Sequence, residues 1–474
     1  MPALKQRAVL LLGVALAGCA SYQPLPLDTD VRAPVNPADI RIDVSAMPLP
    51  QLRHHVFDPG DGLDMTEVAM LAVANNPGLK LARDERGIAH AQAFAAGLLP
   101  DPVLDLAGGF PFSGPDVDSA LRLGLAYDLR SLLTHSEATQ AAEASARRID
   151  LDLLWKEWQV VSRARALFIR DNYQRQALVL LAQEHERLAQ RHAEMVDAHR
   201  RGDVALGVLG ADLVALQAIE RRINDLQRRR AATDQDLNSL LGLSPRAALD
   251  LVGSPTIAPV SEATVNRDLA ELPRRRPDLL ALAAGYQSED ARYRKAILEQ
   301  FPAVDVGFVR ARDTGGTNTL GFDVSMTLPL FNRNQGNIAI EQATRQRLHD
   351  EYATRVLRAR ADVERILRDQ ALLRARRHDL EAGIALAARM RDAARAAMSR
   401  GDLSGAGYAQ IEAAWIDDRL NLLAVDRTML EQQAALQALL GGRIHGRVSG
   451  QSRDRRTLTS APRSEPPPAT PRRR

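Results

Sequence analysis

Cysteine, aromatic residues and long apolar runs are all scarce in this chain. Of its 474 residues one is a cysteine and 4% are aromatic. A single cysteine excludes intramolecular disulfides and any metal site built from several cysteines. No stretch beyond the N-terminal segment reaches about 18 consecutive apolar residues, so the sequence predicts no transmembrane helix. If the chain crosses a membrane, it must do so with β-strands that close on one another and leave no unpaired edge.

The composition instead favours long packed helices. Hydrophobic residues make up 45% of the chain, and Ala, Leu, Arg, Glu and Gln, all good helix formers, predominate. The net charge of +3 comes from a basic tail, 443–474, which holds nine Arg against two acids and is predicted to be disordered. The remainder carries −4, so the basic pI predicts no nucleic-acid partner. No nucleotide-binding, zinc-protease or nucleophile motif is present, and we expect neither an enzyme nor a cofactor.

The N-terminus has the pattern of a secretory signal. Lys5 and Arg7 precede an apolar run that is too short to span a bilayer, and the run ends at Leu-Ala-Gly-Cys19. This end resembles a bacterial lipobox, so residues 1–18 are interpreted as a lipoprotein signal peptide and Cys19 as the lipidated N-terminus, with palmitate among its acyl chains. Because Ala20 follows the cysteine, the resemblance implies sorting to the outer membrane. Seven prolines in 19–60 predict an extended, lipid-anchored arm without a core of its own.

The rest of the chain is a tandem duplication. Gly202 and Gly401 each interrupt a proline-free helical tract, and they lie 199 positions apart (401 − 202). Three further landmark pairs keep nearly the same offset, namely Pro77 and Pro277, Pro100 and Pro302, and Gly242 and Gly441. Four landmarks in order and in register predict two structural repeats, 61–260 and 261–442.

Each repeat contains one predicted β-hairpin. The strands are expected at about 103–110 and 120–130 in the first repeat and at about 303–311 and 319–330 in the second. Apolar residues alternate there with small or polar ones, as in Leu320, Phe322 and Val324. This alternation fits a barrel wall with one face toward lipid, and it fits a half-buried soluble sheet equally well. Four strands are too few to close a barrel, so a barrel needs several chains.

A long helical tract follows each hairpin. A helix over 135–200 would be ~98 Å long at 1.5 Å per residue, which suits a coiled-coil conduit or stalk better than a compact domain. At Gly202 and Gly401 the chain has to turn back, because a second tract of similar character follows. Each repeat is therefore predicted to mount two strands on antiparallel helices.

These features resemble the TolC-type outer-membrane efflux family, in particular its lipoprotein members. The resemblance covers about 64–442. Its most specific parts are Leu-Pro-Arg-Arg-Arg-Pro-Asp-Leu at 272–279, the strand exit Leu-Pro-Leu-Phe-Asn-Arg-Asn-Gln-Gly at 328–336, and the paired glycine turns. The implied architecture is mainly α with a small β portion: a homotrimer whose twelve strands form an outer-membrane β-barrel, continued by a periplasmic α-helical tunnel.

The resemblance also implies a function and partners. The protein is expected to be a passive export duct of a tripartite efflux pump that carries small molecules or metal ions. It would work with a periplasmic adaptor (membrane fusion) protein and an inner-membrane pump of the resistance-nodulation-division type. The hairpin tips at 201–206 and 400–405 would bind the adaptor and close the duct, through Arg201, Gly202, Asp203, Leu206, Arg400, Gly401, Asp402 and Leu403. Beyond the second tip many members carry acidic residues where this chain has Gly407 and Gln410, which puts cation selection at the gate in question.

One histidine series is a weak candidate for metal binding. His185, His192 and His199 recur every seven residues on one face of the helix that approaches the first tip. Successive members lie ~10 Å apart along the axis, too far to share one metal within a chain. A threefold axis could turn each into a ring, whereas the nearby Glu184, Glu186 and Glu194 suit a solvated, charged exterior. We expect no metal site.

Two other classes of protein share some of these features. A periplasmic adaptor is also a lipoprotein with a helical hairpin, but it predicts one hairpin inserted in a β-rich domain. A non-conducting coiled-coil lipoprotein leaves the alternation at 320–330 unexplained. The sequence leaves the cargo open.

Overall fold

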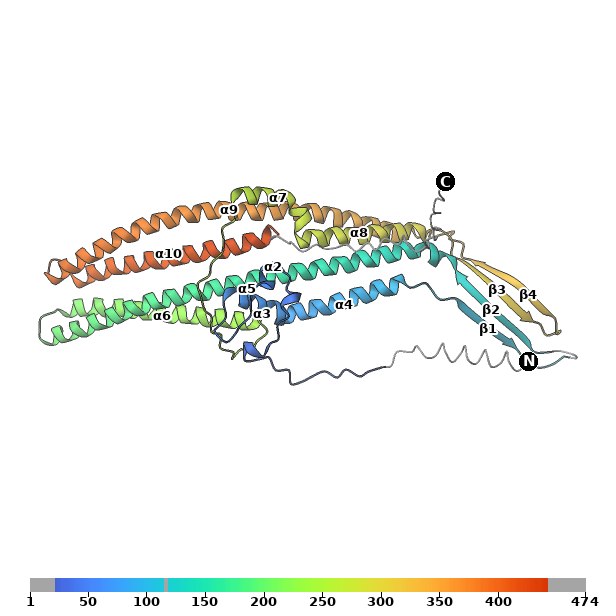
Figure 1. Cartoon of the computed structure of the whole chain (residues 1–474), viewed down its shortest axis with the longest axis horizontal. Helices are drawn as coiled ribbons and strands as arrows, with labels where there is room; N and C mark the ends of the chain where they lie inside the picture. The colour runs from blue at the N-terminus through green and yellow to red at the C-terminus, as the bar shows by residue number, and fades with distance from the viewer. Residues whose placement is uncertain (1–21, 115–117, 442–474) are drawn as a thin grey trace, which may run out of the picture.

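The computed structural model describes residues 22–114 and 118–441. The predicted signal peptide, Cys19 and the basic tail lie outside the described residues. The remaining chain runs twice through the same order of elements (Figure 1). The first copy comprises α3 (Met65–Asn75), α4 (Pro77–Gly97), β1 (Val103–Gly109), β2 (Ala120–Asp128), α5 (Leu129–Arg200) and α6 (Leu206–Leu240). The second comprises α7 (Glu262–Arg275), α8 (Pro277–Leu298), β3 (Val304–Arg312), β4 (Asn318–Met326), α9 (Gln335–Ser399) and α10 (Gly405–Leu439). The predicted mainly helical fold with duplicated hairpins is confirmed.

The duplication extends to individual contacts. Gly242, just after α6, has φ +63°, and a Cβ there would lie 2.4 Å from the carbonyl oxygen of Asn75 at the end of α3. Gly441, just after α10, has φ +70° and lies against Arg275 at the end of α7. In both copies, therefore, a glycine in the left-handed conformation ends a helix and turns the chain onto the short helix of the same repeat. We call this contact the closure of the repeat.

The long helices form where the chain has no proline. Helix α5 has 72 residues and α9 has 65. The side chain of Asp128 caps the first of them by accepting the N–H of Arg130, so β2 passes directly into α5. The second exit is a sharper bend over 327–334, in which Arg333 and Asn334 have φ of 46° and 56°. Asn334 stabilises this bend by donating its Nδ2–H to the carbonyl of Ala296, 2.9 Å away.

The two hairpins join into one antiparallel sheet of order β1-β2-β3-β4. The register pairs Leu125 with Phe308 and Phe308 with Phe322, so the apolar residues of adjacent strands share one face. That face is uncovered in the single chain: Phe308 is 69% and Phe322 79% exposed. The second strand of each hairpin ends earlier than expected, at Asp128 and at Met326. Leu129 already belongs to α5, and Pro329 has no N–H to donate to a ladder.

The segment before α3 does not remain an extended arm throughout. Residues 22–35 have no regular structure, whereas 36–53 form three short helical turns, η1 (Pro37–Asp39), η2 (Val44–Ala46) and α2 (Pro50–Arg53). Met47 and Leu52 are 2% and 0% exposed and join the largest apolar cluster, with α3, the middle of α5 and the end of α6. The expectation of a coreless arm is therefore wrong for this part, because scattered apolar residues between the prolines cover α3, whose residues 67–73 are all buried.

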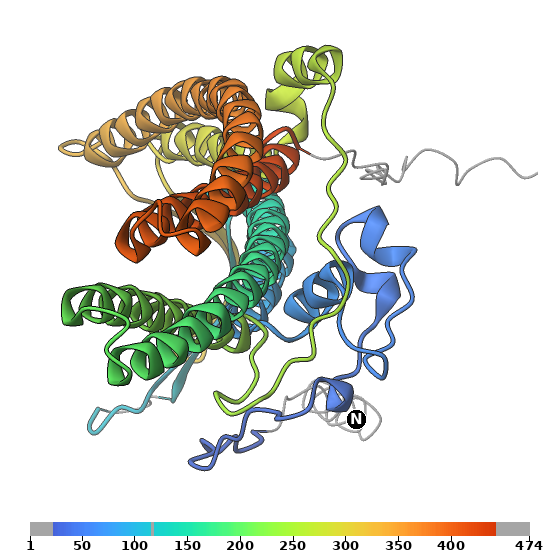
Figure 2. The ribbon, with the colours of Figure 1, turned by 90° about the vertical axis from the view of Figure 1, so that its left-hand side faces the viewer.

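The long helices follow an arc when viewed end-on (Figure 2). The N-terminal segment and the linker at 252–261 lie on the outer side of this arc. They form a belt at about the middle of the helices, next to the largest apolar cluster. Within the described part of the chain, no helix combines the length and the apolar character needed to cross a membrane.

The closure of the first repeat can be tested at its glycine. Gly242→Ala places a Cβ against a backbone oxygen at 2.4 Å and in a left-handed conformation, so we expect a large loss of stability. Gly253→Ala is the matched control, because Gly253 has φ +79° but nothing within 4 Å of a Cβ. The control should lower the free energy of unfolding by about 1 kcal/mol, the cost of the backbone conformation alone.

The measurement is the thermal unfolding midpoint by circular dichroism at one fixed scan rate. The midpoint of Gly242→Ala should fall several degrees below that of Gly253→Ala. Equal midpoints for the two variants would show that the contact with Asn75 contributes nothing to the closure.

Candidate functional site

The two glycine turns lie at the same end of the molecule (Figure 1). Gly202 and Gly401 have φ of 84° and 80°, and a Cβ on either would meet nothing within 4 Å. In each turn the aspartate N–H bonds back over the glycine at 2.9 Å, from Asp203 to Ala198 and from Asp402 to Ala397. Both turns are thus the same helix-ending motif, and glycine is needed there for its conformation.

The side chains predicted at the tips are presented to solvent in matching pairs. Arg201 Nε lies 3.0 Å from Asp203 Oδ2, and Arg400 Nε lies 2.9 Å from Asp402 Oδ2. Leu206, the first residue of α6, is 68% exposed, whereas Leu403 is half-buried. A Cβ on Gly405 would lie 3.6 Å from Val208, so the two tips touch through α6 and α10. The tips therefore form one exposed surface with repeated Arg-Asp pairs.

A polar cluster joins the two hairpins a few turns above the tips. We call it the interhairpin cluster, and its members are Glu184, Arg187, Arg191, Asp212, Arg391, Arg395, Tyr408, Glu412 and Trp415. They come from all four tip helices, α5, α6, α9 and α10. The helices of one hairpin are thus tied to those of the other through charged groups.

Arg191 is the central residue of the interhairpin cluster. Its Nε donates to Asp212 Oδ1 on α6 at 2.6 Å, and its NH1 lies 3.5 Å from Glu412 Oε2 on α10. The side chain of Arg191 is 13% exposed, and those of Asp212 and Glu412 are 7% and 5% exposed. Because these groups are withdrawn from water, removing one partner leaves a buried charge without compensation.

Aromatic residues of α10 complete the cluster from the second hairpin. Tyr408 donates its hydroxyl hydrogen to Glu412 Oε1 at 2.9 Å and accepts hydrogen bonds from Arg395 on α9 at 3.3 Å. The guanidinium of Arg391 lies 4.2 Å from the centre of the Trp415 ring, a cation–π contact within the second hairpin. Arg187 lies 5.9 Å from the same ring but belongs to α5, so it adds to the contact between hairpins.

Sequence reasoning missed this cluster. Glu184 was expected on a charged exterior, but it is completely buried. Asp212 on α6 is the partner of Arg191. A possible signal was the spacing of Glu184, Arg187 and Arg191 along one helical face, with Tyr408, Glu412 and Trp415 on another, but their pairing depends on how the two hairpins pack.

The histidine series is distributed over separate contacts. His185 Nε2 lies 3.4 Å from Glu220, and His192 Nδ1 lies 3.2 Å from Asp212. His199 Nδ1 donates to the carbonyl of Val204 at 2.7 Å, within the first tip. Each histidine thus binds a different group of its own hairpin.

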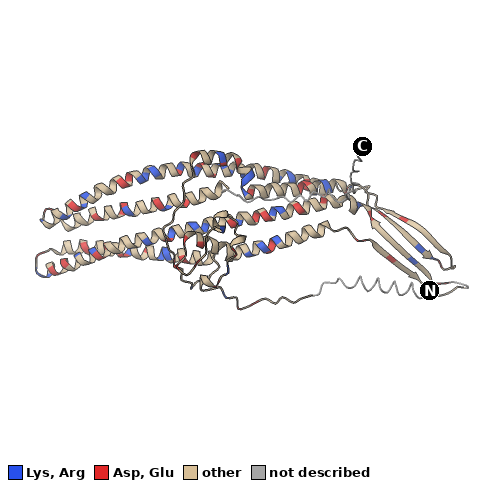
Figure 3. Cartoon of the chain, in the orientation of Figure 1, with Lys and Arg blue, Asp and Glu red and all other residues tan. Residues whose placement is uncertain are grey.

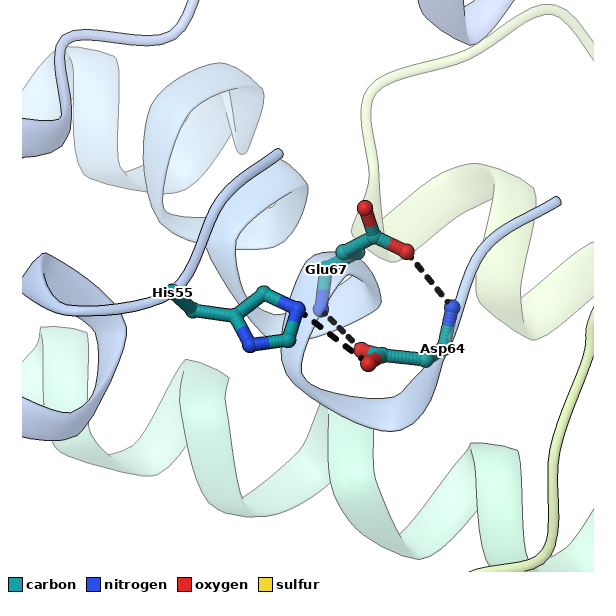
Figure 4. A group of neighbouring side chains, drawn as sticks. All are labelled: His55, Asp64 and Glu67. Carbon is teal, nitrogen blue, oxygen red and sulfur yellow. Dashed lines mark hydrogen bonds and ion pairs between the residues drawn. The ribbon is translucent and has the colours of Figure 1, made fainter. Parts of the chain in front are cut away.

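Among the described residues, one group of metal-binding side chains lies close enough to share an ion, His55, Asp64 and Glu67 (Figure 4). Its geometry is that of a helix cap. Asp64 Oδ1 accepts the N–H groups of Thr66 and Glu67, and the carboxylate of Glu67 accepts those of Asp58 at 2.7 Å and Asp64 at 2.9 Å. His55 Nε2 lies 3.1 Å from Asp64 Oδ2. Since backbone donors already occupy these oxygens, the group is explained as the capping box of α3.

The polar face of the sheet carries an ion-pair network. Arg122 on β2 donates to Asp323 on β4 at 2.9 Å and lies 3.8 Å from Asp105 on β1. Its side chain passes over β3, which separates β2 from β4. This face therefore suits water, whereas the opposite face is apolar except for Arg310 and Arg312 near the end of β3.

Known proteins match this chain by family and by fold. A family model described as "Outer membrane efflux protein" matches residues 269–442, the second repeat. The second repeat of this chain therefore resembles the outer membrane efflux proteins.

Several solved channel structures share the fold. The outer-membrane channel OprN aligns with a TM-score of 0.70 and 16% identity over 89% of this chain and 99% of OprN. The Campylobacter jejuni outer membrane channel CmeC aligns with a TM-score of 0.69 and 14% identity over 90% of this chain and 95% of CmeC. CusC aligns with a TM-score of 0.68 and 17% identity over 84% of this chain and 97% of CusC. The structures of CusC concern folding and transmembrane channel formation. No curated protein matches the sequence significantly. This chain thus has the fold of these outer-membrane channels.

The interhairpin cluster contains a carboxyl group whose pKa is raised toward neutrality. Burial, followed by the neighbouring carboxylate of Glu412, raises the pKa of Glu184 to about 7, against the opposing effect of Arg187 and Arg191. The folded pKa lies above the ordinary value of about 4.3, so the folded protein keeps a proton that the unfolded chain releases. The contribution of Glu184 to stability is therefore fully present below about pH 4 and is lost as the pH rises to about 7.

Glu184→Gln tests this titration. Glutamine resembles the protonated acid, so at pH 8 the variant should be more stable than the wild type, by on the order of 1–2 kcal/mol. At pH 5 the two should differ little. The measurement is amide hydrogen exchange of α5 and α10 around the cluster at both pH values. Glu186→Gln, an exposed carboxyl on the same helix, is the control and should have no such effect. If Glu184→Gln raised the stability equally at pH 5 and pH 8, the raised pKa of Glu184 would be contradicted.

Proposed function

We propose that three copies of this chain form a passive export duct through the outer membrane, as part of a tripartite efflux pump. One observation carries the proposal: the sheet exposes an apolar face and has two free edges, β1 and β4, in the single chain. Free edges are not tolerated in lipid, because their N–H and C=O groups find no partner there. Pairing β1 of one copy with β4 of the next, three times over, removes every edge and gives a closed barrel of twelve strands.

The two faces of the sheet support the same arrangement. Leu106, Phe322 and Leu320 are 66–81% exposed on the apolar face, which would face lipid. Arg122 with its two aspartates lies on the other face, which would line a water-filled channel. A non-conducting stalk or an adaptor gives no reason for this division between the faces, so the duct is the better explanation.

The helices would continue the barrel as a periplasmic tunnel. One chain forms an arc, and three arcs would complete a tube with the belt of 36–60 and 252–261 on its outside (Figure 2). The tips lie at the end opposite the sheet (Figure 1), and their exposed residues Arg201, Asp203, Arg400 and Asp402 would bind a periplasmic adaptor. The interhairpin cluster would hold this end closed. Lipidation of Cys19 would anchor the barrel end of the chain to the outer membrane.

Cargo choice would belong to an inner-membrane pump of the resistance-nodulation-division type. The three histidines that were weak metal candidates each contact a separate partner of their own hairpin, so cargo choice is assigned to none of them. The duct would therefore pass small molecules or metal ions without a catalytic step of its own.

The barrel proposal predicts opposite results for two neighbouring residues. Phe322→Arg places a charge on the lipid-facing side of β4, at a cost of about 2–4 kcal/mol near the bilayer centre, and should prevent stable trimers in outer-membrane vesicles. Gly321→Arg is the matched control on the other face, where a Cβ meets nothing within 4 Å. It should assemble normally. Trimers are measured by crosslinking and native electrophoresis of extracted membranes. Equal loss in both variants would contradict the assignment of the faces.

The duct proposal predicts conductance without a pump. Purified full-length protein in planar bilayers should give discrete steps with no energy source. Arg191→Gln removes the contacts to Asp212 and Glu412, and it should raise the open fraction several-fold. Arg200→Gln is the control on the same helix, since Arg200 is 74% exposed and pairs only with Asp197 among the described residues. If folded trimers never conduct, even as Arg191→Gln, the strands do not line a pore.

A further inference from the structure

A cavity of about 410 Å³ lies where the two repeats meet. Its walls come from the middle of α5 in the first repeat, the end of α10 and the start of α7 in the second, the linker between the repeats, and α2 of the N-terminal segment. We call it the seam cavity. The elements that line it, α2, the linker and the middle of α5, lie at the belt, away from both the tips and the sheet (Figure 1).

Two hydrogen-bond donors in the wall of the seam cavity have no partner. Trp158 is 2% exposed, and its indole N–H makes no hydrogen bond to any described residue. The buried Nε of Arg165, two turns along α5, is also without a bond there. Leaving such donors unsatisfied costs about 1–3 kcal/mol each, more for a charged group. A ligand that accepts hydrogen bonds would remove this cost.

Arg165 is a cation without a carboxylate partner among the described residues. Its NH2 group reaches only Gln51, whose Oε1 lies 3.4 Å away. Burial lowers the pKa of Arg165, which shows how far its charge is withdrawn from water. The one acid in the wall, Asp268, is already bound by Arg275 at 2.5 Å and Arg267 at 3.3 Å. The positive charge of Arg165 is therefore not balanced by Asp268.

The rest of the wall is mostly apolar. It is formed by Leu49, Val161, Pro259, Val260, Ala434 and Leu440. The cavity volume falls within the range of about 300–1,000 Å³ that is usual for small-molecule sites, and an apolar wall with a few fixed polar groups is typical of them. A single arginine beside an indole N–H suits one small anionic group, and the walls suit a hydrocarbon body.

We propose that the seam cavity binds a small amphipathic anion, such as a medium-chain carboxylate, with its charged group on Arg165 and Trp158 and its chain along the apolar wall. The site is separate from the duct and does not depend on conduction. Because its walls belong to both repeats and to the linker, an occupant would stabilise their association through its binding free energy.

Octanoate is the probe, since it is soluble and carries one carboxylate on a linear chain. It is titrated into the full-length protein in amphipol by calorimetry. We expect saturable binding with one site per chain and a concentration-dependent rise of the unfolding midpoint. Octylammonium has the same chain with the opposite charge and should bind at least about tenfold more weakly, because it cannot accept hydrogen bonds and meets a like charge.

Matched variants locate the site. Arg165→Gln should weaken octanoate binding by about tenfold or more, the loss expected for a charge-assisted hydrogen bond. Arg163→Gln changes an exposed arginine two residues away on the same helix and should bind as the wild type. Trp158→Phe keeps the ring but loses the N–H, and it should weaken binding several-fold. Unchanged secondary structure and elution volume show that each variant is folded.

Three outcomes overturn the proposal. The first is the absence of saturable octanoate binding by the folded wild type. The second is equal affinity for octanoate and octylammonium, which would reduce the site to an apolar crevice. The third is equal weakening by Arg163→Gln and Arg165→Gln, which would place binding on the general surface charge of α5.

Discussion

The fold depends on keeping one helix of 72 residues, α5, in contact with partners along its whole length. An isolated helix gains little stability in water from its own hydrogen bonds, so its stability has to come from packing. Near the sheet α5 packs against α4 and α8, at mid-length against α3 and the end of α6, and toward the tips against α6 and α10. Because the partners come from both repeats, α5 holds the two halves of the chain together.

The character of these contacts changes along α5. At mid-length its buried residues are apolar, such as Val161, Leu167 and Phe168, and they belong to the largest cluster of the protein. Toward the tips a smaller apolar cluster that includes Leu181 and Ile416 is joined by buried Glu184 and by contacts of arginine on α5 with glutamate and tyrosine on α10. Exposing apolar side chains to water costs free energy for every methylene uncovered, whereas charged groups regain hydration when they separate. The contact at mid-length is therefore mainly apolar, whereas the contact toward the tips combines apolar packing with buried charged groups.

Charges are distributed to match this difference. Charged residues of both signs are spread along the long helices, whereas the strands carry few (Figure 3). Most charged residues of the strands lie on one face of the sheet, where Arg122 contacts Asp105 and Asp323. One chain thus has a mostly apolar sheet face at one end and an exposed surface with Arg-Asp pairs at the other.

Sequence predicted the features that are determined locally. Gly202 and Gly401 were found because a left-handed helix end needs glycine, and the strands because alternation with period two is visible without knowing the partner strand. The packing of the N-terminal segment was not predictable, since Met47 and Leu52 are isolated between prolines and become core residues only where α3 leaves space. Glu184, expected in solvent, is buried because α10 from the other repeat covers it. The seam cavity combines five separate segments, and no local pattern reports it.

Equivalent positions in the two repeats make different contacts. In the first repeat Asn75 and Asn76 donate from their side chains to the carbonyls of Leu241 and Leu240 at 2.7 Å, a contact within that repeat. The equivalent of Asn76 is Arg276 (276 − 76 = 200), which bonds to Asp278 at 2.8 and 2.9 Å.

Arg276 also lies 4.9 Å from the ring centre of Trp155 on α5, so it reaches from the second repeat to the first. Both members of the Arg276–Asp278 pair are about 95% buried, and such a pair contributes little net stability once its desolvation is counted. Its contact with the Trp155 ring does fix how α8 lies against α5. At this position the first repeat therefore has an asparagine contact that closes that repeat, whereas the second has an arginine contact that reaches the other repeat.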